Sequence, residues 1–115
     1  MSRDEKMYLG DILQGCQKVM KFTEGLNKKQ LVEDEKTYDA VVRNLEIIGE
    51  AAKNVSNELR NQLADIEWRK IAGMRDMLAH SYFGIDNDIL WDVVQNKVPG
   101  LTKAVNSFLN KNQNS

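Results

Sequence analysis

The chain has 115 residues, of which 42% are hydrophobic and 29% are charged, and its net charge is −1 at pH 7. This length and composition fit one soluble globular domain with a modest core, and no apolar run approaches the roughly 20 residues that cross a membrane. The near-neutral charge argues against a protein that coats nucleic acid, although a local basic pocket could still engage one or two phosphates.

The first residues and the cysteine content indicate a cytoplasmic protein. The segment MSRDEK at the N-terminus contains acidic residues and no apolar stretch, so we expect no signal peptide. Cys16 is the only cysteine, which excludes an intrachain disulfide and fits a reducing compartment. Without a cluster of cysteine and histidine, a zinc site is not expected. We therefore expect no cofactor and no resident metal, unless a metal arrives with the substrate.

Apolar residues at helical spacing predict that helices dominate the first half of the chain. A first helix is predicted over residues 4–25, and residues 26–33 are predicted to be a connection. Asp34 is the expected N-cap of a second long helix that ends near Val55. The residues predicted to face the core on these helices are Tyr8, Leu9, Ile12, Cys16, Val19, Met20, Phe22, Tyr38, Val41, Val42, Leu45, Ile48, Ala52 and Val55.

The second half continues this pattern. Leu59 and Leu63 are expected in a short helical turn or a loop, and a third helix is predicted over residues 67–80. Asp86 is the expected N-cap of a fourth helix, and Pro99 either kinks that helix or lies in the first turn of a last one. The residues predicted to face the core here are Trp68, Ile71, Ala72, Met74, Leu78, Ile89, Leu90, Trp91, Val93, Val94, Leu101, Val105, Phe108 and Leu109.

These elements predict an all-α fold, a single four- to five-helix up-down bundle over residues 1–109 with a frayed polar tail over residues 110–115. Gly49 lies in the middle of the second helix, where glycine costs about 1 kcal/mol relative to alanine. We expect a close contact between helices as the compensation, either within the core or at the interface of a dimer.

The stretch with the clearest chemical meaning contains Arg75 and, five residues later, His80, which is the only histidine. Histidine can accept and donate a proton near neutral pH, and arginine offers a fork of donors suited to a phosphate. The pair therefore indicates phosphodiester chemistry. The plainer interpretation is that a lone histidine near a helix end is a surface or capping residue.

The spacing of this pair poses a geometric difficulty. Five residues along an α-helix correspond to about 500°, so Arg75 and His80 would point about 140° apart. Either the helix ends near Ala79 and the chain turns His80 around, or the working cleft lies between two subunits. Asp76 lies on the same face as His80 and could accept a hydrogen bond from one imidazole nitrogen.

Three charged residues of the second helix, Arg43, Glu46 and Glu50, are spaced so that they share one side of it. One interpretation is a solvated face with an ordinary ion pair, worth a few tenths of a kcal/mol. The other is a supporting set of side chains that positions Arg75 or a nucleotide.

Together these blocks resemble the HEPN superfamily (higher eukaryotes and prokaryotes nucleotide-binding), and within it the HepT-like branch, also known as DUF86. The motif is Arg75-x4-His80-x-Tyr82. The supporting blocks are residues 43–52 (RNLEIIGEAA), 68–76 (WRKIAGMRD) and 89–94 (ILWDVV), the last followed by Pro99. The resemblance covers roughly residues 1–109.

The resemblance implies a ribonuclease toxin of a type VII-like toxin–antitoxin system, which acts on RNA as a homodimer and has no membrane association. Carried over by position, Arg75 and His80 would be the catalytic pair, and Asp76 the polar residue that follows the arginine. The antitoxin would be a minimal nucleotidyltransferase that silences the toxin by adding AMP to Tyr82.

The mechanism expected from these residues is metal-independent RNA cleavage, in which the substrate's 2′-hydroxyl attacks the adjacent phosphate. His80 would transfer a proton, and Arg75 would neutralise the charge on the phosphorane. Two alternatives stay open. The bundle could be a non-catalytic module that binds a nucleotide or presents a substrate to a nucleotidyltransferase, or a purely structural interaction protein. Tyr82 could equally be a half-buried aromatic that anchors its loop.

Overall fold

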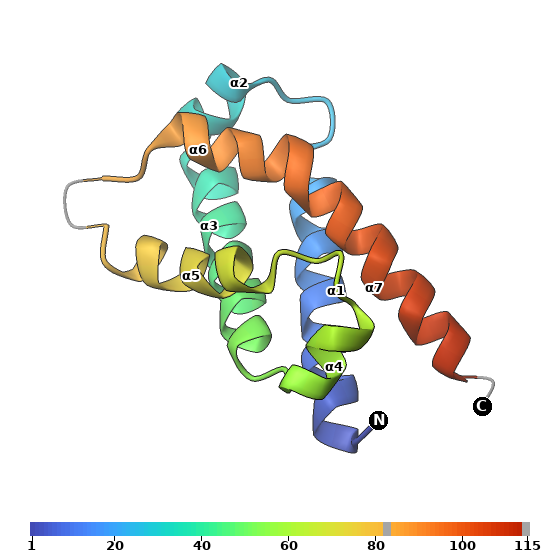
Figure 1. The fold of residues 1–115 in the computed structure, drawn as a ribbon. Coiled ribbons are helices and arrows are strands. Elements are labelled where there is room, and N and C mark those ends of the chain that lie inside the picture. The colour runs from blue at the N-terminus through green and yellow to red at the C-terminus, as the bar shows by residue number, and fades with distance from the viewer. Residues whose placement is uncertain (82–83, 114–115) are drawn as a thin grey trace.

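In the computed structural model, which describes residues 1–81 and 84–113, every regular element is helical (Figure 1). The helices are α1 (Arg3–Thr23), α2 (Lys28–Glu33), α3 (Glu35–Lys53), α4 (Asn57–Gln62), α5 (Trp68–Ala79), α6 (Asn87–Asp92) and α7 (Val98–Gln113), with a π-helical turn (Val93–Lys97) between α6 and α7. Within this part of the chain, four helices have 12 residues or more and three have six each. The prediction of an all-α helical bundle is confirmed.

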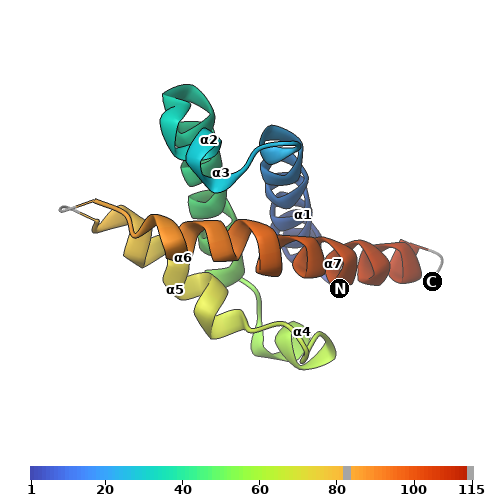
Figure 2. The ribbon, with the colours of Figure 1, turned by 90° about the horizontal axis from the view of Figure 1, so that it is seen from above.

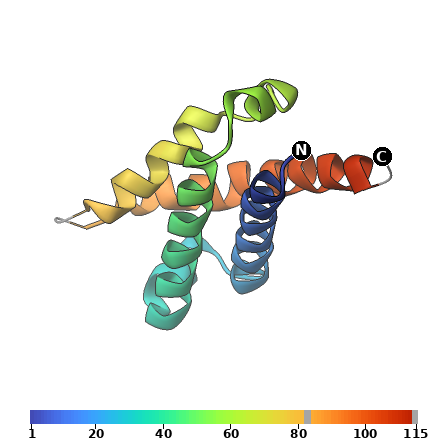
Figure 3. The ribbon, with the colours of Figure 1, turned by 90° about the horizontal axis from the view of Figure 1, so that it is seen from below.

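Helices α1 and α3 form the centre of the bundle, side by side and antiparallel (Figures 1 and 3). Gly15 of α1 lies against α3, since a Cβ built on it would fall 2.7 Å from Cγ1 of Ile48. Helix α5 packs on α3, and α7 crosses α1 (Figure 3). The buried side chains of these four long helices make one continuous core. Within it, α3 contacts both α1 and α5.

Side-chain caps explain where the predicted helices begin. The Asp34 carboxylate accepts a hydrogen bond from the backbone N–H of Thr37 at 3.1 Å. Asp86 accepts from the backbone N–H groups of Asp88 and Ile89 at 3.0 and 3.2 Å. Such caps satisfy N–H groups that have no partner within the helix. Both predicted N-caps are confirmed.

The segment predicted to be a plain connection, residues 26–33, contains helix α2 instead. Asn27 and Gln30 form a reciprocal capping box at its start: Asn27 accepts from the N–H of Gln30 at 2.8 Å, and Gln30 accepts from the N–H of Asn27 at 2.9 Å. Leu31 is 1% exposed and anchors this short helix on the core. Local capping and one buried leucine are therefore enough to stabilise a helix of six residues here.

Most residues predicted to face the core are buried or partly buried, but Met20, Phe22 and Ile89 are 39%, 37% and 46% exposed. On α1 the buried stripe passes through Val19 and Thr23. Met20 and Phe22 lie on either side of that stripe because successive residues of a helix are about 100° apart. Ile89 is displaced in the same way from the buried Leu90.

Helix α6, the π-helical turn and α7 follow one another along one continuous path (Figure 2). Pro99 lies in the first turn of α7, directly after the π-helical turn, so the second of its two predicted positions is confirmed. Helix α7 runs on to Gln113 and so extends into the segment expected to be a frayed tail. In the described part of the chain, no helix combines the length and apolar character that a membrane crossing requires.

Candidate functional site

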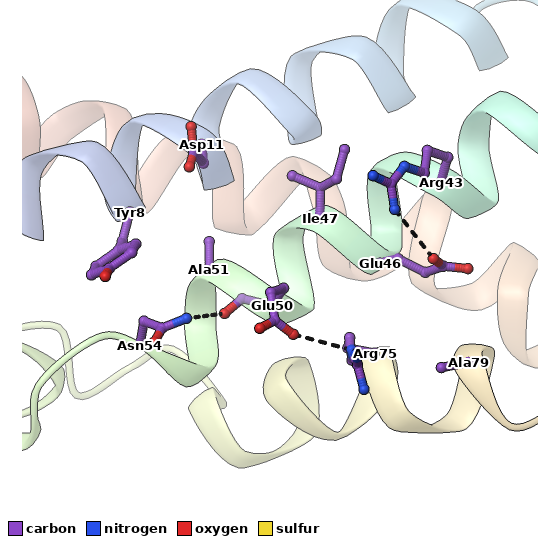
Figure 4. A pocket seen from close by; sticks show the side chains of 10 residues that line it. All are labelled: Tyr8, Asp11, Arg43, Glu46, Ile47, Glu50, Ala51, Asn54, Arg75 and Ala79. Carbon is purple, nitrogen blue, oxygen red and sulfur yellow. Dashed lines mark hydrogen bonds and ion pairs between the residues drawn. The ribbon is translucent and has the colours of Figure 1, made fainter. Parts of the chain in front are cut away.

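A trough runs along α3, with α1 on one side and α5 on the other, and has a volume of about 280 Å³ (Figure 4). Helix α3 supplies half of its lining residues because residues three and four apart share a helix face. The lining residues are Tyr8 and Asp11 of α1, Arg43, Glu46, Ile47, Glu50 and Ala51 of α3, Asn54 just after it, and Arg75 and Ala79 of α5.

The close approach of α3 and α5 places Arg75 in the trough. A Cβ built on Gly49 would fall 2.7 Å from Cβ of Arg75, 2.9 Å from its backbone nitrogen and 3.1 Å from the carbonyl oxygen of Ile71. No side chain fits between the two backbones at this point. The prediction that Gly49 marks a close contact between helices is confirmed, and the contact lies within the fold.

The Arg75 guanidinium lies between two carboxylates (Figure 4 shows the first pair). Its Nε is 3.1 Å from Oε2 of Glu50, and its Nη1 is 3.3 Å from Oδ1 of Asp76. Each pair is partly exposed and therefore stabilises the fold only slightly. Their combined effect is to restrict the direction of the guanidinium, which is the role expected of a supporting side chain such as Glu50.

Asp76 is itself held by a second cation. Lys53 Nζ lies 3.1 Å from its Oδ1. The hydrogen bond from Lys53, followed by that from Arg75, holds the pKa of the Asp76 carboxyl below its ordinary value of 3.8. Asp76 is therefore an anion at neutral pH. Its expected hydrogen bond to the imidazole of His80 stays a prediction.

The other two charged residues expected to lie beside Arg75 do line the same trough. Arg43 Nη1 lies 3.6 Å from Oε2 of Glu46, one turn along α3 from Glu50. The sequence spacing of Arg43, Glu46 and Glu50 is thus matched by a shared face in the structure. Because Glu46 pairs with Arg43 and Glu50 with Arg75, the two arginines are held at separate points along the trough.

Helix α5 ends at Ala79, and His80 is its C-cap residue, with φ −110° and ψ 23°. The backbone N–H of His80 still donates to the carbonyl of Asp76 at 3.1 Å. The predicted helix end near Ala79 is confirmed, whereas the turning of His80 toward Arg75 stays a prediction. His80 is exposed and follows a residue that lines the trough, but it is not among the lining residues itself. Tyr82 lies outside the described residues.

From the sequence we did not predict as site residues three polar side chains of the lining, those of Tyr8, Asp11 and Asn54, or the cation Lys53 beside Asp76. Tyr8 was predicted to be a core residue, and it is only partly buried. Among the described residues, no group of three or more histidine, cysteine, aspartate or glutamate side chains is placed to hold a metal ion.

The fold and the site define a small all-α protein in which an arginine, fixed by a helix–helix contact, precedes a histidine at the end of the same helix. The chain belongs to the ribonuclease HepT-like family, whose model matches residues 12–108. The resemblance based on the Arg75–His80 motif and its flanking blocks is thereby confirmed, and the chain is assigned to a family of ribonucleases.

Several relatives are similar over nearly their whole length. The chain is 43% identical over 101 residues to the "Probable ribonuclease HepT" of Thermococcus cleftensis, covering 88% of this chain and 92% of that protein. It is 41% identical over 104 residues to "Putative RNase TTE0752" of Caldanaerobacter subterraneus, covering 90% and 93%. It is 38% identical over 107 residues to "Putative RNase MJ0127" of Methanocaldococcus jannaschii, covering 93% and 88%. No solved structure matches the chain significantly.

Proposed function

We propose that this protein is a metal-independent endoribonuclease that acts as the toxin of a toxin–antitoxin pair, with Arg75 and His80 as its catalytic residues. The observation that carries the proposal is the fixed position of Arg75. Its backbone is packed against Gly49 and its guanidinium is paired with Glu50, at the helix end where His80 is exposed. Membership of the ribonuclease HepT-like family supports RNA as the substrate.

The proposed reaction is an internal transfer within the RNA. The 2′-hydroxyl loses its proton to a base and forms a bond to the adjacent phosphorus, and the bond from phosphorus to the 5′-oxygen breaks. The leaving oxygen takes up a proton, so the products are a 2′,3′-cyclic phosphate and a 5′-hydroxyl. His80 performs a proton transfer, which typically contributes about 10²- to 10⁴-fold. Arg75 stabilises the charge that grows on the phosphate oxygens.

This reaction needs both a base and an acid, while each chain has a single histidine. A homodimer would supply a second histidine, and we propose that the working unit is such a dimer. The exposure of His80 supports this arrangement, since a residue at an open helix end can face a second copy of the chain.

The proposal includes control by a minimal nucleotidyltransferase that transfers AMP to Tyr82. A bulky phosphodiester two residues from His80 would occupy the space of the substrate and repel its phosphate. Tyr82 lies outside the described residues, so this step rests on the resemblance of the motif alone.

The test of the proposed activity compares four chains expressed in cells: wild type, Arg75→Ala, His80→Ala and, as a matched control, Arg69→Ala. Arg69 is an exposed arginine of the same helix that does not line the trough. Wild type and Arg69→Ala are expected to arrest growth and fragment RNA, and the other two variants are not. Equal growth and intact RNA in all four cultures would contradict the ribonuclease and favour a binding module.

Two measurements on purified protein address the mechanism. Cleavage should continue in EDTA, because neither catalytic residue acts through a metal. A substrate with a single 2′-deoxynucleotide at the cleaved position should resist cleavage, because the attacking hydroxyl is missing. Loss of activity in EDTA, or cleavage of the deoxy substrate at the normal rate, would contradict the proposed chemistry.

A further inference from the structure

We propose that the trough along α3 is a nucleobase pocket, and that Asp11 makes it favour a base with an exocyclic amino group over uracil. This inference rests on the proposed ribonuclease function, because Arg75 belongs both to the trough and to the proposed catalytic pair. A nucleotide whose phosphate meets Arg75 can place its base along the trough.

The charges of the lining residues favour a base over a phosphate in the body of the trough. Three carboxylates, those of Asp11, Glu46 and Glu50, face only two guanidinium groups. Both arginines are already paired, Arg43 with Glu46 and Arg75 with Glu50. A phosphate can still contact the Arg75 guanidinium. Further along the trough it would lie near the carboxylate of Asp11, which is paired with no cation in the described part of the chain, and be repelled by it. A neutral group rich in hydrogen-bond donors suits that part better.

The acceptors in this part of the trough are Asp11 and Asn54. Within residues 1–81 and 84–113, the partly buried Asp11 carboxylate forms neither a hydrogen bond nor an ion pair. Asn54 donates its Nδ2 hydrogen to the carbonyl oxygen of Glu50 at 2.9 Å, which leaves its Oδ1 as an acceptor. An ionised carboxylate only accepts hydrogen bonds. Asn54 therefore offers one acceptor and keeps its second N–H as a donor, whereas the Asp11 carboxylate offers acceptors only.

The same end of the trough offers an aromatic ring and an aliphatic surface. Figure 4 shows Tyr8 and Asn54 at one end of the trough, with Ala51 of α3 beside them. Tyr8 is only partly buried and lines the trough, so part of its side chain is available to a ligand. Bases stack on such rings with little regard to sequence, and loss of the ring typically weakens binding roughly tenfold. Stacking on Tyr8 would hold a base, and the acceptors would then select which base.

The selection follows from the edges of the bases. Cytosine carries an amino group at N4 and adenine one at N6, and a carboxylate accepts from such groups. Uracil carries a carbonyl oxygen where cytosine carries its amino group, so its lone pairs would face those of Asp11. Cytosine and uracil have nearly the same size. The expected preference for cytosine over uracil is therefore electrostatic, because the two bases do not differ in how well they fit the trough by size.

The experiment uses pairs of short RNAs that differ by one cytosine or uracil on either side of the cleaved linkage. Wild type is expected to cleave the cytosine RNA with a kcat/KM at least about tenfold higher. Asp11→Asn, which keeps the shape and adds a donor, should reduce this ratio to near one by improving cleavage of the uracil RNA. Asp65→Asn, which alters an exposed aspartate outside the trough, should keep the wild-type ratio.

A binding measurement separates failure of this inference from failure of the ribonuclease. CMP and UMP are titrated into wild-type protein, and the amide NMR signals of Tyr8, Asp11 and Asn54 are followed. Shifts at these residues with CMP and much weaker ones with UMP would support the pocket even in a chain that cleaves no RNA. The same base ratio in wild type and Asp11→Asn, or nucleotide shifts confined to other regions, would overturn it. A basic protein segment that occupies the trough and excludes CMP would overturn it as well.

Discussion

Gly49 and Arg75 approach so closely that a Cβ added to Gly49 would lie 2.7 Å from Cβ of Arg75. Gly49→Ala should therefore push α5 away from α3. We expect the free energy of unfolding to fall by about 1–3 kcal/mol, because overpacking outweighs the gain in helix propensity of about 1 kcal/mol. Urea denaturation followed by circular dichroism measures the change.

Gly73→Ala is the matched control for that substitution. Gly73 is also a helical glycine, on α5, but a Cβ built there meets no atom within 4 Å. This variant should be stabilised by about 0.5–1 kcal/mol, since alanine favours the helix. A Gly49→Ala variant as stable as Gly73→Ala would show that the helices can separate without cost.

Glu50 should matter for cleavage more than for folding. Glu50→Ala removes the partner of Arg75 Nε and leaves only the contact with Asp76. We expect kcat/KM for RNA to fall by roughly tenfold or more, because the direction of the guanidinium is then less restricted. The free energy of unfolding should change by less than about 1 kcal/mol, because both partners are exposed. Glu46→Ala breaks the pair with Arg43 instead and is the comparison. Equal losses in the two variants would speak against a specific role for Glu50.

The charge of Asp76 should depend on Lys53. In Lys53→Met the pKa of the Asp76 carboxyl is expected to rise toward 3.8, since its largest cause of lowering is gone. A lowered pKa stabilises the fold above the ordinary carboxyl range, and that contribution disappears as the pH falls through the lowered value. NMR titration of the carboxyl carbon measures the shift. Lys97→Met, whose ammonium group pairs with Glu67, should leave the Asp76 pKa unchanged.

Cys16 should be protected from thiol reagents while the protein is folded. The side chain is fully buried, and burial raises the pKa of the thiol to about 11 from 9.0, a shift opposed only in part by a hydrogen bond with Thr102. Two units of pKa lower the thiolate fraction about 100-fold, and the thiolate is the reactive form. The rate of reaction with Ellman's reagent at pH 8 should rise at least that much in urea. Equal rates with and without urea would indicate an open core.

Substitution of Tyr82 should leave the toxicity of the protein intact but prevent its silencing by the antitoxin. Under the proposed function, Tyr82→Phe keeps the ring and loses the hydroxyl that would receive AMP. Cells that express this variant should stop growing even when the partner nucleotidyltransferase is present, whereas the wild-type chain is silenced. Mass spectrometry of wild type should show the added AMP on the peptide with Tyr82. If cells that express Tyr82→Phe grow normally, the Tyr82 hydroxyl has a structural or catalytic role instead.

The long helices could be predicted from the sequence because an apolar stripe that continues over several turns has one consistent period. The second helix was predicted to follow its N-cap Asp34 and to end near Val55, and it is found as Glu35–Lys53. Helix α2 was missed because six residues are too few for such a period to show. Its capping box, Asn27 with Gln30, was the available signal, but residues 26–33 were interpreted as a connection. The π-helical turn before Pro99 gave no distinct pattern.

The site was predictable where it depends on a single helix. Arg43, Glu46 and Glu50 share a face of α3 because of helix geometry alone, and Gly49 predicted a contact without naming its partner. The pairing of Glu50 with Arg75, and of Lys53 with Asp76, depends on how α5 docks on α3. Tyr8 and Asp11 join the trough because of how α1 docks. The way these helices dock depends on how all the core side chains pack together, and the pattern of a single sequence does not reveal that packing.

The contact between Gly49 and Arg75 joins two segments that are far apart in the sequence. Arg75 takes its position only after α3 and α5 have docked. Under the proposed function, a chain in which these helices have not yet docked has no assembled catalytic site. The docking of α3 and α5 that stabilises the fold would therefore also create the activity that damages cellular RNA. Proteases that remove unfolded copies would then remove harmless ones, and only the fully folded protein would need an antitoxin.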